Sequence, residues 1–278
     1  MKRERLPNYT RESASIPGRL WREGKPHLIP LYGLMLTSDL AREGILRSGS
    51  FRFADHVYVG RASGRLGIGR LLDAVLLRLP AARSFRNRYR HSRDMLVAEA
   101  QRLAADRPGE IRLVSAPCGI ARELVEARAS LDAAGIGDRV RFIGIDLDPE
   151  PLALSARLAG DDARFTFIRG DAFDAAVYPE ACDAIASTGL ADFLDDAEAV
   201  RFYETCRRAL RPGGLLATSS QQPQPLADYL MRELAELRAI YRSADELHAL
   251  LQRAGFPEIA IRRDAVGFQL LATARAPR

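Results

Sequence analysis

Residues 111–120, IRLVSAPCGI, decide how this chain folds. The first half alternates apolar and β-branched side chains, as a buried strand does. The second half, SAPCG, contains only compact residues, so that backbone and a ligand can approach each other closely there. The residues that follow, ARELVEARASL, predict a helix whose free N–H groups point toward the same place. The stretch therefore predicts a strand, a tight turn and a helix that begins beside a ligand.

The chain from residue 111 onward alternates between strand-like and helix-like segments. We predict strands at 111–115, 140–145, 164–168, 182–187 and 214–219, and helices at 119–131, 149–158, 173–178 and 195–210. Such alternation is typical of a parallel sheet with helices on both faces. A helix-rich stretch follows over 226–253, and two last strands at 258–263 and 268–274 have the spacing of an antiparallel hairpin at the sheet edge. The second strand ends in Asp146, where a ribose-binding carboxylate is expected at a switch point of the sheet.

The first part of the chain has a different pattern. Residues 1–27 contain several Pro and Gly and are predicted to be irregular. Ser38 or Asp39 can cap a helix over 40–47, and the Gly- and Ser-rich residues 48–69 predict a packed loop or a lid. Further helices are predicted over 70–79 and 82–103. We therefore expect a basic, mainly helical cap or lid region over 1–95 and an α/β domain over 96–278.

Charge is distributed unevenly along the chain. Residues 1–95 hold 19 Lys and Arg against 8 Asp and Glu, a net charge of +11, whereas residues 96–278 hold 22 against 28, a net of −6. A basic front region suggests a phosphate, a nucleic acid or an anionic membrane surface as partner, although Arg is favoured over Lys throughout the chain. The three Cys are widely spaced and form neither a disulfide framework nor a zinc motif.

No segment has the pattern of a secretory signal or the length of a membrane span. We therefore expect a cytoplasmic protein of one large domain with an N-terminal appendage, and no metal site is predicted.

Several pieces of the chain, in their order and spacing, resemble the class I S-adenosylmethionine-dependent methyltransferases. They are the turn VSAPCGIAR, the second strand end GIDLDPEPLALSARL, the third strand FTFIRGDAFD, the fourth strand and helix CDAIASTGLADFLDDAEAVRFYETCRRALRPGG, and the hairpin after YRSADELHALLQRAGF. The resemblance covers roughly residues 95–277. It implies a Rossmann-like, mostly parallel methyltransferase sheet and S-adenosylmethionine as cofactor, with S-adenosylhomocysteine as the product.

The resemblance also implies which residues hold the cofactor. Ser115, Ala116, Pro117, Cys118 and Gly119 should face its amino acid part. Asp146 should accept both ribose hydroxyls, because a carboxylate can take two donors at once; Asp148 is the better cap for the helix that follows. The adenine should contact Leu147, Asp171, Ala172 and Phe173. The sulfonium and the methyl group should lie over Ser187, Thr188 and Gly189.

The chain departs from the family pattern at the first motif. The family usually has an acidic residue and two or three glycines there, but this chain has Ser115 and Gly119. Small residues still leave space for the cofactor beside the turn. The motif no longer indicates which residue binds the methionine part of the cofactor. Arg90 or Arg93, on the preceding helix, could pair with the methionine carboxylate, since a guanidinium suits bidentate contact with a carboxylate.

Methyl transfer is an in-line displacement at carbon in which a cationic sulfur leaves, so that the enzyme mainly supplies orientation and a dry site. A general base is needed only for a nucleophile that does not lose its proton readily. The sequence offers His56, Asp192 and Tyr58 as candidates for catalysis, with Tyr32 and His91 as further possibilities.

The acceptor is predicted to be a small molecule or a lipid with an anionic or phosphate group. The fourth strand ends in Ser187-Thr188-Gly189-Leu190 instead of the Asn/Asp-Pro-Pro-aromatic tetrapeptide of enzymes that methylate exocyclic base amines. Residues 1–95 contain no recognised nucleic-acid module. The alternatives are an RNA-directed methyltransferase, an aminopropyl transferase, or a non-enzymatic adaptor that binds nucleic acid. An oxidoreductase is disfavoured because the three-glycine fingerprint is absent.

Overall fold

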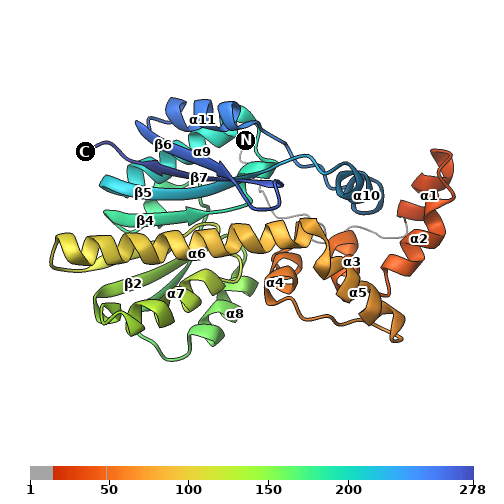
Figure 1. The fold of residues 1–278 in the computed structure, drawn as a ribbon, viewed down its shortest axis with the longest axis horizontal. Coiled ribbons are helices and arrows are strands. Elements are labelled where there is room, and N and C mark those ends of the chain that lie inside the picture. Colours follow the sequence, from red (N-terminus) through yellow and green to blue (C-terminus); the bar gives the residue numbers. More distant parts are fainter. Residues whose placement is uncertain (1–14, 48) are drawn as a thin grey trace. The chain divides into compact units, whose positions relative to one another are not determined.

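The computed structural model describes residues 15–47 and 49–278 (Figure 1). These residues form two compact units. The first contains the described residues up to Arg86 together with Pro223–Ala239, and the second contains Asn87–Gln222 and Ile240–Arg278.

The second unit is built on a 7-stranded sheet in the order β3-β2-β1-β4-β5-β7-β6. Strands β1 to β5 run parallel to their neighbours, and β7 is antiparallel to both β5 and β6. The bounds are β1 Ile111–Ser115, β2 Val140–Asp146, β3 Phe165–Arg169, β4 Cys182–Ser187, β5 Leu210–Gln221, β6 Glu258–Arg263 and β7 Gln269–Arg275. The predicted Rossmann-like sheet with its antiparallel edge hairpin is confirmed. The order reverses between β1 and β4, which is where open sheets of this kind bind ligands.

Helices cover both faces of this sheet. One face carries the part of α6 (Pro80–Asp106) that lies in this unit, with α7 (Arg122–Ala133) and α8 (Pro149–Ala159); the other carries α9 (Asp196–Ala209) and α11 (Ala244–Arg253) (Figure 1). Each face has its own core of buried apolar side chains. Short 3-10 helices follow at Gly137–Arg139, Ala175–Val177 and Ala191–Phe193. The predicted α/β alternation is therefore present with only small shifts in the ends of the elements.

The first unit is helical. Its elements are α1 (Ser15–Arg22), α2 (Leu28–Met35), α3 (Asp39–Leu46), α4 (Phe51–Val59), α5 (Ile68–Arg78), the beginning of α6 and α10 (Pro225–Ala235). Ser38 caps α3, as predicted. The buried carboxylate of Asp73 accepts hydrogen bonds from the Ser38 hydroxyl and from the backbone N–H groups of Leu40 at 2.9 Å and Ser63 at 3.0 Å. One buried acid therefore joins α5 to the start of α3 and to the segment that follows α4.

Two predictions for the front of the chain are wrong in the described residues. Residues 15–22 form α1 instead of an irregular segment, because Pro17 lies in the first turn of the helix, where its missing N–H has no partner to lose; residues 1–14 lie outside the described residues. Residues 51–59 form α4 instead of a loop, since Ser50 caps the helix and Gly60, at φ +67°, ends it.

The boundary between the units also differs from the expected 95/96. It falls at Arg86 and Asn87 inside α6. The Arg86 guanidinium donates to the carbonyls of Val57 and Leu77 in the first unit, whereas the Asn87 amide donates to Asp264 Oδ2 in the second at 2.8 Å. Residues 223–239 return to the first unit because Leu234 and Ala235 belong to its apolar core.

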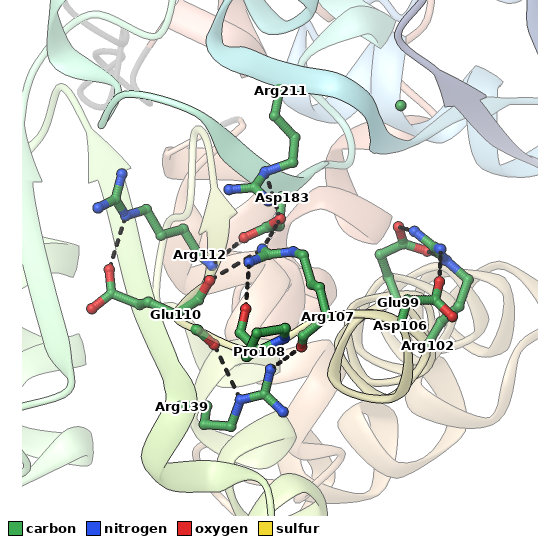
Figure 2. A network of polar contacts seen from close by, with 12 residues as sticks. Glu99, Arg102, Asp106, Arg107, Pro108, Glu110, Arg112, Arg139, Asp183 and Arg211 are labelled. Atoms are coloured by element: carbon green, nitrogen blue, oxygen red, sulfur yellow. Dashed lines mark hydrogen bonds and ion pairs between the residues drawn. The ribbon is translucent and has the colours of Figure 1, made fainter. Parts of the chain in front are cut away.

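A network of charged groups holds the amino ends of the central strands (Figure 2). Asp183, on β4, is fully buried, and it pairs with the guanidinium groups of Arg107 at 2.7 Å and Arg211 at 2.8 Å. It also accepts the backbone N–H of Arg112 on β1 at 2.8 Å. One carboxylate thus connects the end of α6 with β1, β4 and β5 at the amino ends of these strands.

This network predicts that Asp183→Asn destabilises the fold. Removing one partner of a buried ion pair leaves the other charges uncompensated, so we expect the free energy of unfolding to fall by about 3 kcal/mol in urea denaturation. The control is Asp106→Asn, which breaks the exposed pair with Arg102 and should change stability by at most about 0.5 kcal/mol. Equal effects of the two substitutions would contradict this account of the network.

Candidate functional site

The end of β2 and the turn after β1 meet at the carboxylate of Asp146. Its Oδ2 accepts the backbone N–H of Gly119 at 2.8 Å, and its Oδ1 accepts that of Asp148 at 3.0 Å. Asp146 is half-buried, and burial raises its pKa even though these N–H groups oppose the shift. A carboxylate has about four lone-pair sites, so two hydroxyl donors can still bind to it. Asp148 caps α8 through the N–H of Glu150 at 2.9 Å, as predicted.

The turn of small residues is held on both sides by the neighbouring strands. The N–H of Ala116 donates to the carbonyl of Ala186 on β4 at 3.0 Å, and the N–H of Cys118 donates to the carbonyl of Ile145 on β2 at 2.9 Å. A Cβ at Gly144 of β2 would lie 3.1 Å from the Cys118 sulfur. Gly119 has φ +50°, a backbone conformation that side chains disfavour. The turn is therefore a rigid element at the switch point.

The end of β3 lies next to the same carboxylate. The N–H of Gly170 donates to the main-chain carbonyl of Asp146 at 2.9 Å. Asp171 is exposed, and one oxygen of its side chain accepts the N–H of Phe173 at 3.0 Å. The Ala172 side chain is buried in the core and that of Phe173 packs against it, so these two residues offer backbone more than side chain to a ligand. Leu147, directly after Asp146, is half-buried.

A second carboxylate lies at the end of β1, and the sequence analysis missed it. Ser115, the last residue of β1, is buried, and its hydroxyl donates to Glu123 Oε1 in the first turn of α7. Glu123 is only 8% exposed. Burial raises the pKa of Glu123 to about 7, although the Ser115 hydrogen bond opposes the shift. The position at which the family motif has an acid is thus occupied by a serine that holds a glutamate from the helix. An acid in the first turn of the helix after such a strand was the available signal.

The end of β4 contacts a buried arginine that was also missed. Ser187 is buried, while Thr188 and Gly189 are half-buried. A Cβ at Gly189, which has φ +97°, would lie 3.1 Å from Nη1 of Arg88 on α6. Arg88 is 4% exposed, and it pairs with Asp192 at 3.6 Å. The available signal was helical periodicity, which sets Arg88 apart from the exposed arginines of the same run.

Asp192 is fully buried between several elements. Its Oδ1 accepts the N–H of Gln221 at the end of β5 at 2.9 Å, and its main-chain carbonyl accepts the N–H of Ile240 at 2.7 Å. Burial raises the pKa of Asp192 to about 6 against the opposing effect of Arg88. Asp192 therefore anchors Arg88 beside Gly189.

The two arginines expected to pair with the methionine carboxylate do not take this buried position on α6, and their role toward a cofactor stays a prediction. Arg93 pairs with Asp94 at 2.7 Å and with Glu126 of α7 at 2.9 Å. Arg90 is exposed. The structure gives Arg88, and neither of the predicted pair, the buried position beside Gly189.

Three of the other candidates for catalysis, His56, Tyr58 and Tyr32, belong to the first unit. His56 Nε2 lies 2.7 Å from the buried Asp73 carboxylate, which makes His56 part of the network that holds the helices of that unit together. Tyr58, on the same helix, is half-buried, and Tyr32 is buried in an apolar cluster. In the second unit, His91 is buried beside Arg262, and burial lowers its pKa to about 4. A catalytic role for His56 and Tyr58 stays a prediction.

Across residues 15–47 and 49–278, no group of three or more His, Cys, Asp or Glu side chains is placed to hold a metal ion. None of the helices in the same residues has the length and apolar composition needed to cross a membrane.

Comparisons with known proteins agree with the fold. A family model described as "Putative methyltransferase" matches residues 36–276 of the chain. A polyamine aminopropyltransferase of Prochlorococcus marinus (strain MIT 9313) is 28% identical over 193 residues, which are 67% of this chain and 64% of that protein. The chain therefore spans less than two thirds of the length of that relative.

Solved structures share the architecture. The crystal structure of a possible exported protein from Bordetella parapertussis has a TM-score of 0.78 and 25% identity, and the match covers 99% of this chain and 100% of the other. The magnesium protoporphyrin IX methyltransferase of Synechocystis PCC 6803, solved with bound S-adenosylhomocysteine, has a TM-score of 0.52 and 13% identity over 80% of this chain and 93% of its own. At that identity, the second likeness shows the fold alone.

The burial of Glu123 predicts an unusual effect on stability. Because its pKa is raised from 4.5 to about 7, the folded state holds this proton more tightly than the unfolded state, and stability falls as pH rises through that window. Glu123→Gln removes this loss. We expect the stability of the variant relative to wild type to rise by about 2 to 3 kcal/mol between pH 4.5 and pH 8 in urea denaturation.

The matched control is Glu126→Gln on the same helix, because the Glu126 side chain is largely exposed and pairs with Arg93. Its stability relative to wild type should vary little over the same range of pH. Stability curves of Glu123→Gln and wild type that run parallel from pH 4.5 to pH 8 would show that Glu123 does not titrate in this way.

Proposed function

The chain belongs to this family of methyltransferases, and on that premise we propose that it transfers the methyl group of S-adenosylmethionine to a small-molecule or lipid acceptor. The observation that carries the proposal is the contact between Asp146 and Gly119, at 2.8 Å. It brings an acidic strand end and a turn of small residues together where the strand order reverses. A nucleoside with a free ribose fits both: the carboxylate suits the hydroxyls, and the compact turn allows close approach.

The residues at the four strand ends fit the parts of such a cofactor. Asp146 has lone pairs left for two ribose hydroxyls, and half-buried Leu147 offers an apolar surface to the adenine. Asp171 keeps one carboxylate oxygen that no described N–H occupies, and it suits the adenine amino group. When bound, the cofactor supplies an electrophilic methyl group on a sulfonium that leaves as a neutral thioether. Ser187, Thr188 and Gly189 would then orient the acceptor beside that methyl group and exclude water.

The acceptor is proposed to be anionic. Arg88 places a buried guanidinium beside Gly189, at the strand end assigned to the methyl group. The net charge of +11 over residues 1–95 supports attraction of an anion at longer range. A carboxylate or a phosphate on a small molecule or a lipid has this chemistry. The sequence after β4 lacks the tetrapeptide of base-amine methylation, which disfavours a nucleic-acid acceptor.

An aminopropyl transferase is the second candidate, and the 28% identity to a polyamine aminopropyltransferase favours it. That reaction uses decarboxylated S-adenosylmethionine on the same fold. A thermal shift assay with each cofactor separates the two functions: a methyltransferase should be stabilised more by S-adenosylmethionine, and an aminopropyl transferase by the decarboxylated compound.

The proposal predicts the effect of Asp146→Ala on cofactor binding. Hydrogen bonds to a charged group are worth about 1.5 to 3 kcal/mol each, so loss of the ribose contacts should weaken binding of S-adenosylmethionine and S-adenosylhomocysteine at least tenfold in isothermal titration calorimetry. Asp148→Ala is the control, because it removes a helix cap next to the site and should leave both affinities within about twofold. Unchanged affinity in Asp146→Ala would refute the assignment of the nucleoside site.

A further inference from the structure

Glu123 is a buried acid that forms no ion pair with a described Lys or Arg. It is 8% exposed, and its hydrogen bond comes from the neutral hydroxyl of Ser115. In the part of the chain that the structure describes, no Lys or Arg forms an ion pair with it. The buried acids at the amino ends of the strands differ from Glu123 in having cationic partners: Asp183 and Glu99 each pair with two arginines. An acid in this setting is expensive to ionise unless a ligand brings the positive charge.

The described titratable groups that interact electrostatically with Glu123 are neutral or acidic. They are Cys118 in the turn after β1, Tyr89 on α6, and Glu126 one turn further along α7. The acid charges of Asp146 and Glu123 both act on the Cys118 thiol, and with burial they raise its pKa. Two carboxylates therefore flank Cys118: one at the end of β2 and one beside the end of β1. Arg93, which interacts with Tyr89, forms ion pairs with Asp94 and Glu126.

We propose that Glu123, held in place by Ser115, binds the ammonium group of the methionyl tail of the cofactor. The proposal rests on the proposed function, which places the nucleoside at Asp146. From that carboxylate the small-residue turn leads back to Ser115, so the tail of an adenosyl ligand follows the turn to Glu123. The ion pair supplies the positive charge that none of the described residues brings to Glu123.

A pKa of about 7 for Glu123 is what we expect of a buried carboxyl group that ionises fully only when a cationic ligand binds. In the free protein, burial keeps the carboxyl partly protonated near neutral pH. A bound ammonium group lowers that pKa again, so that ligand binding and proton release are coupled. Glu123 therefore supplies the acid that the first motif lacks at Ser115.

Adenosyl ligands with and without an ammonium group should differ in their affinity for this site. S-adenosylhomocysteine has the ammonium and the carboxylate, decarboxylated S-adenosylmethionine keeps only the ammonium, and 5′-methylthioadenosine has neither group. Recognition by Glu123 requires the ammonium alone. A merely structural role for Glu123 in shaping the turn would affect all three ligands alike.

The test is calorimetric titration of these three ligands into wild type, Glu123→Gln, Ser115→Ala and the control Glu126→Gln. We expect Glu123→Gln to weaken S-adenosylhomocysteine and decarboxylated S-adenosylmethionine at least tenfold, and 5′-methylthioadenosine by less than twofold. Ser115→Ala should give a smaller loss with the same order of ligands. Glu126→Gln should stay close to wild type for all of them.

A second readout is pH. The ratio of the affinities for S-adenosylhomocysteine and 5′-methylthioadenosine should rise about tenfold between pH 5.5 and pH 7 in wild type and stay flat in Glu123→Gln. Asp146 also titrates with a raised pKa, but its ribose contacts are common to both ligands and cancel in the ratio.

Equal losses for all three ligands in Glu123→Gln, no loss for any of them, or a loss confined to S-adenosylhomocysteine would each overturn the proposal. If Asp146→Ala abolishes binding while Glu123→Gln leaves the ratios unchanged, the inference about Glu123 fails and the proposed function stands. If wild type binds none of the three ligands, both fail.

Discussion

The functional part of this structure depends on one carboxylate that accepts two backbone N–H groups. Asp146 ties the end of β2 to the turn at Gly119 and to the start of α8 through Asp148. This contact adds to the hydrogen bond from the Cys118 N–H to the carbonyl of Ile145 on β2. Together they make the turn after β1 and the end of β2 one surface at the point where the strand order reverses. The same carboxylate therefore organises the backbone and remains available to a ligand.

Buried acids have different surroundings at the amino ends and at the carboxyl ends of the parallel strands. At the amino ends, hydrogen bonds from Arg275 and Arg102 overcome the effect of burial and lower the pKa of Glu99 to about 2. Asp183 pairs there with two further arginines (Figure 2). At the carboxyl ends, burial has the larger effect and raises the pKa values of Glu123, Asp146 and Asp192. The acids at the amino ends of the strands thus stabilise the fold, while those at the carboxyl ends have raised pKa values, and perturbed pKa values of this kind often cluster at functional sites.

The sheet and the meeting of Asp146 with the turn at Gly119 could be predicted because they follow from local patterns. Period-2 strands, helix caps and the acidic end of β2 each depend on residues close in sequence, and Asp146 and the turn at Gly119 lie where those patterns placed them. The local signals for Arg88 and Glu123, helical periodicity and an acid in the first turn of a helix, do not by themselves show which side chain the fold buries at the site. Which arginine of a helix is buried depends on how the helix packs, and Arg88, instead of Arg90 or Arg93, is the one beside Gly189. The return of residues 223–239 to the first unit is likewise a long-range property.

A crystal structure of the protein with S-adenosylhomocysteine would show where an adenosyl ligand binds. The account predicts that the ribose hydroxyls donate to the carboxylate of Asp146 and that the turn from Ala116 to Gly119 contacts the ligand between its sugar and its amino acid part. A ligand bound away from the carboxyl ends of β1 and β2, with no contact to Asp146, would contradict it.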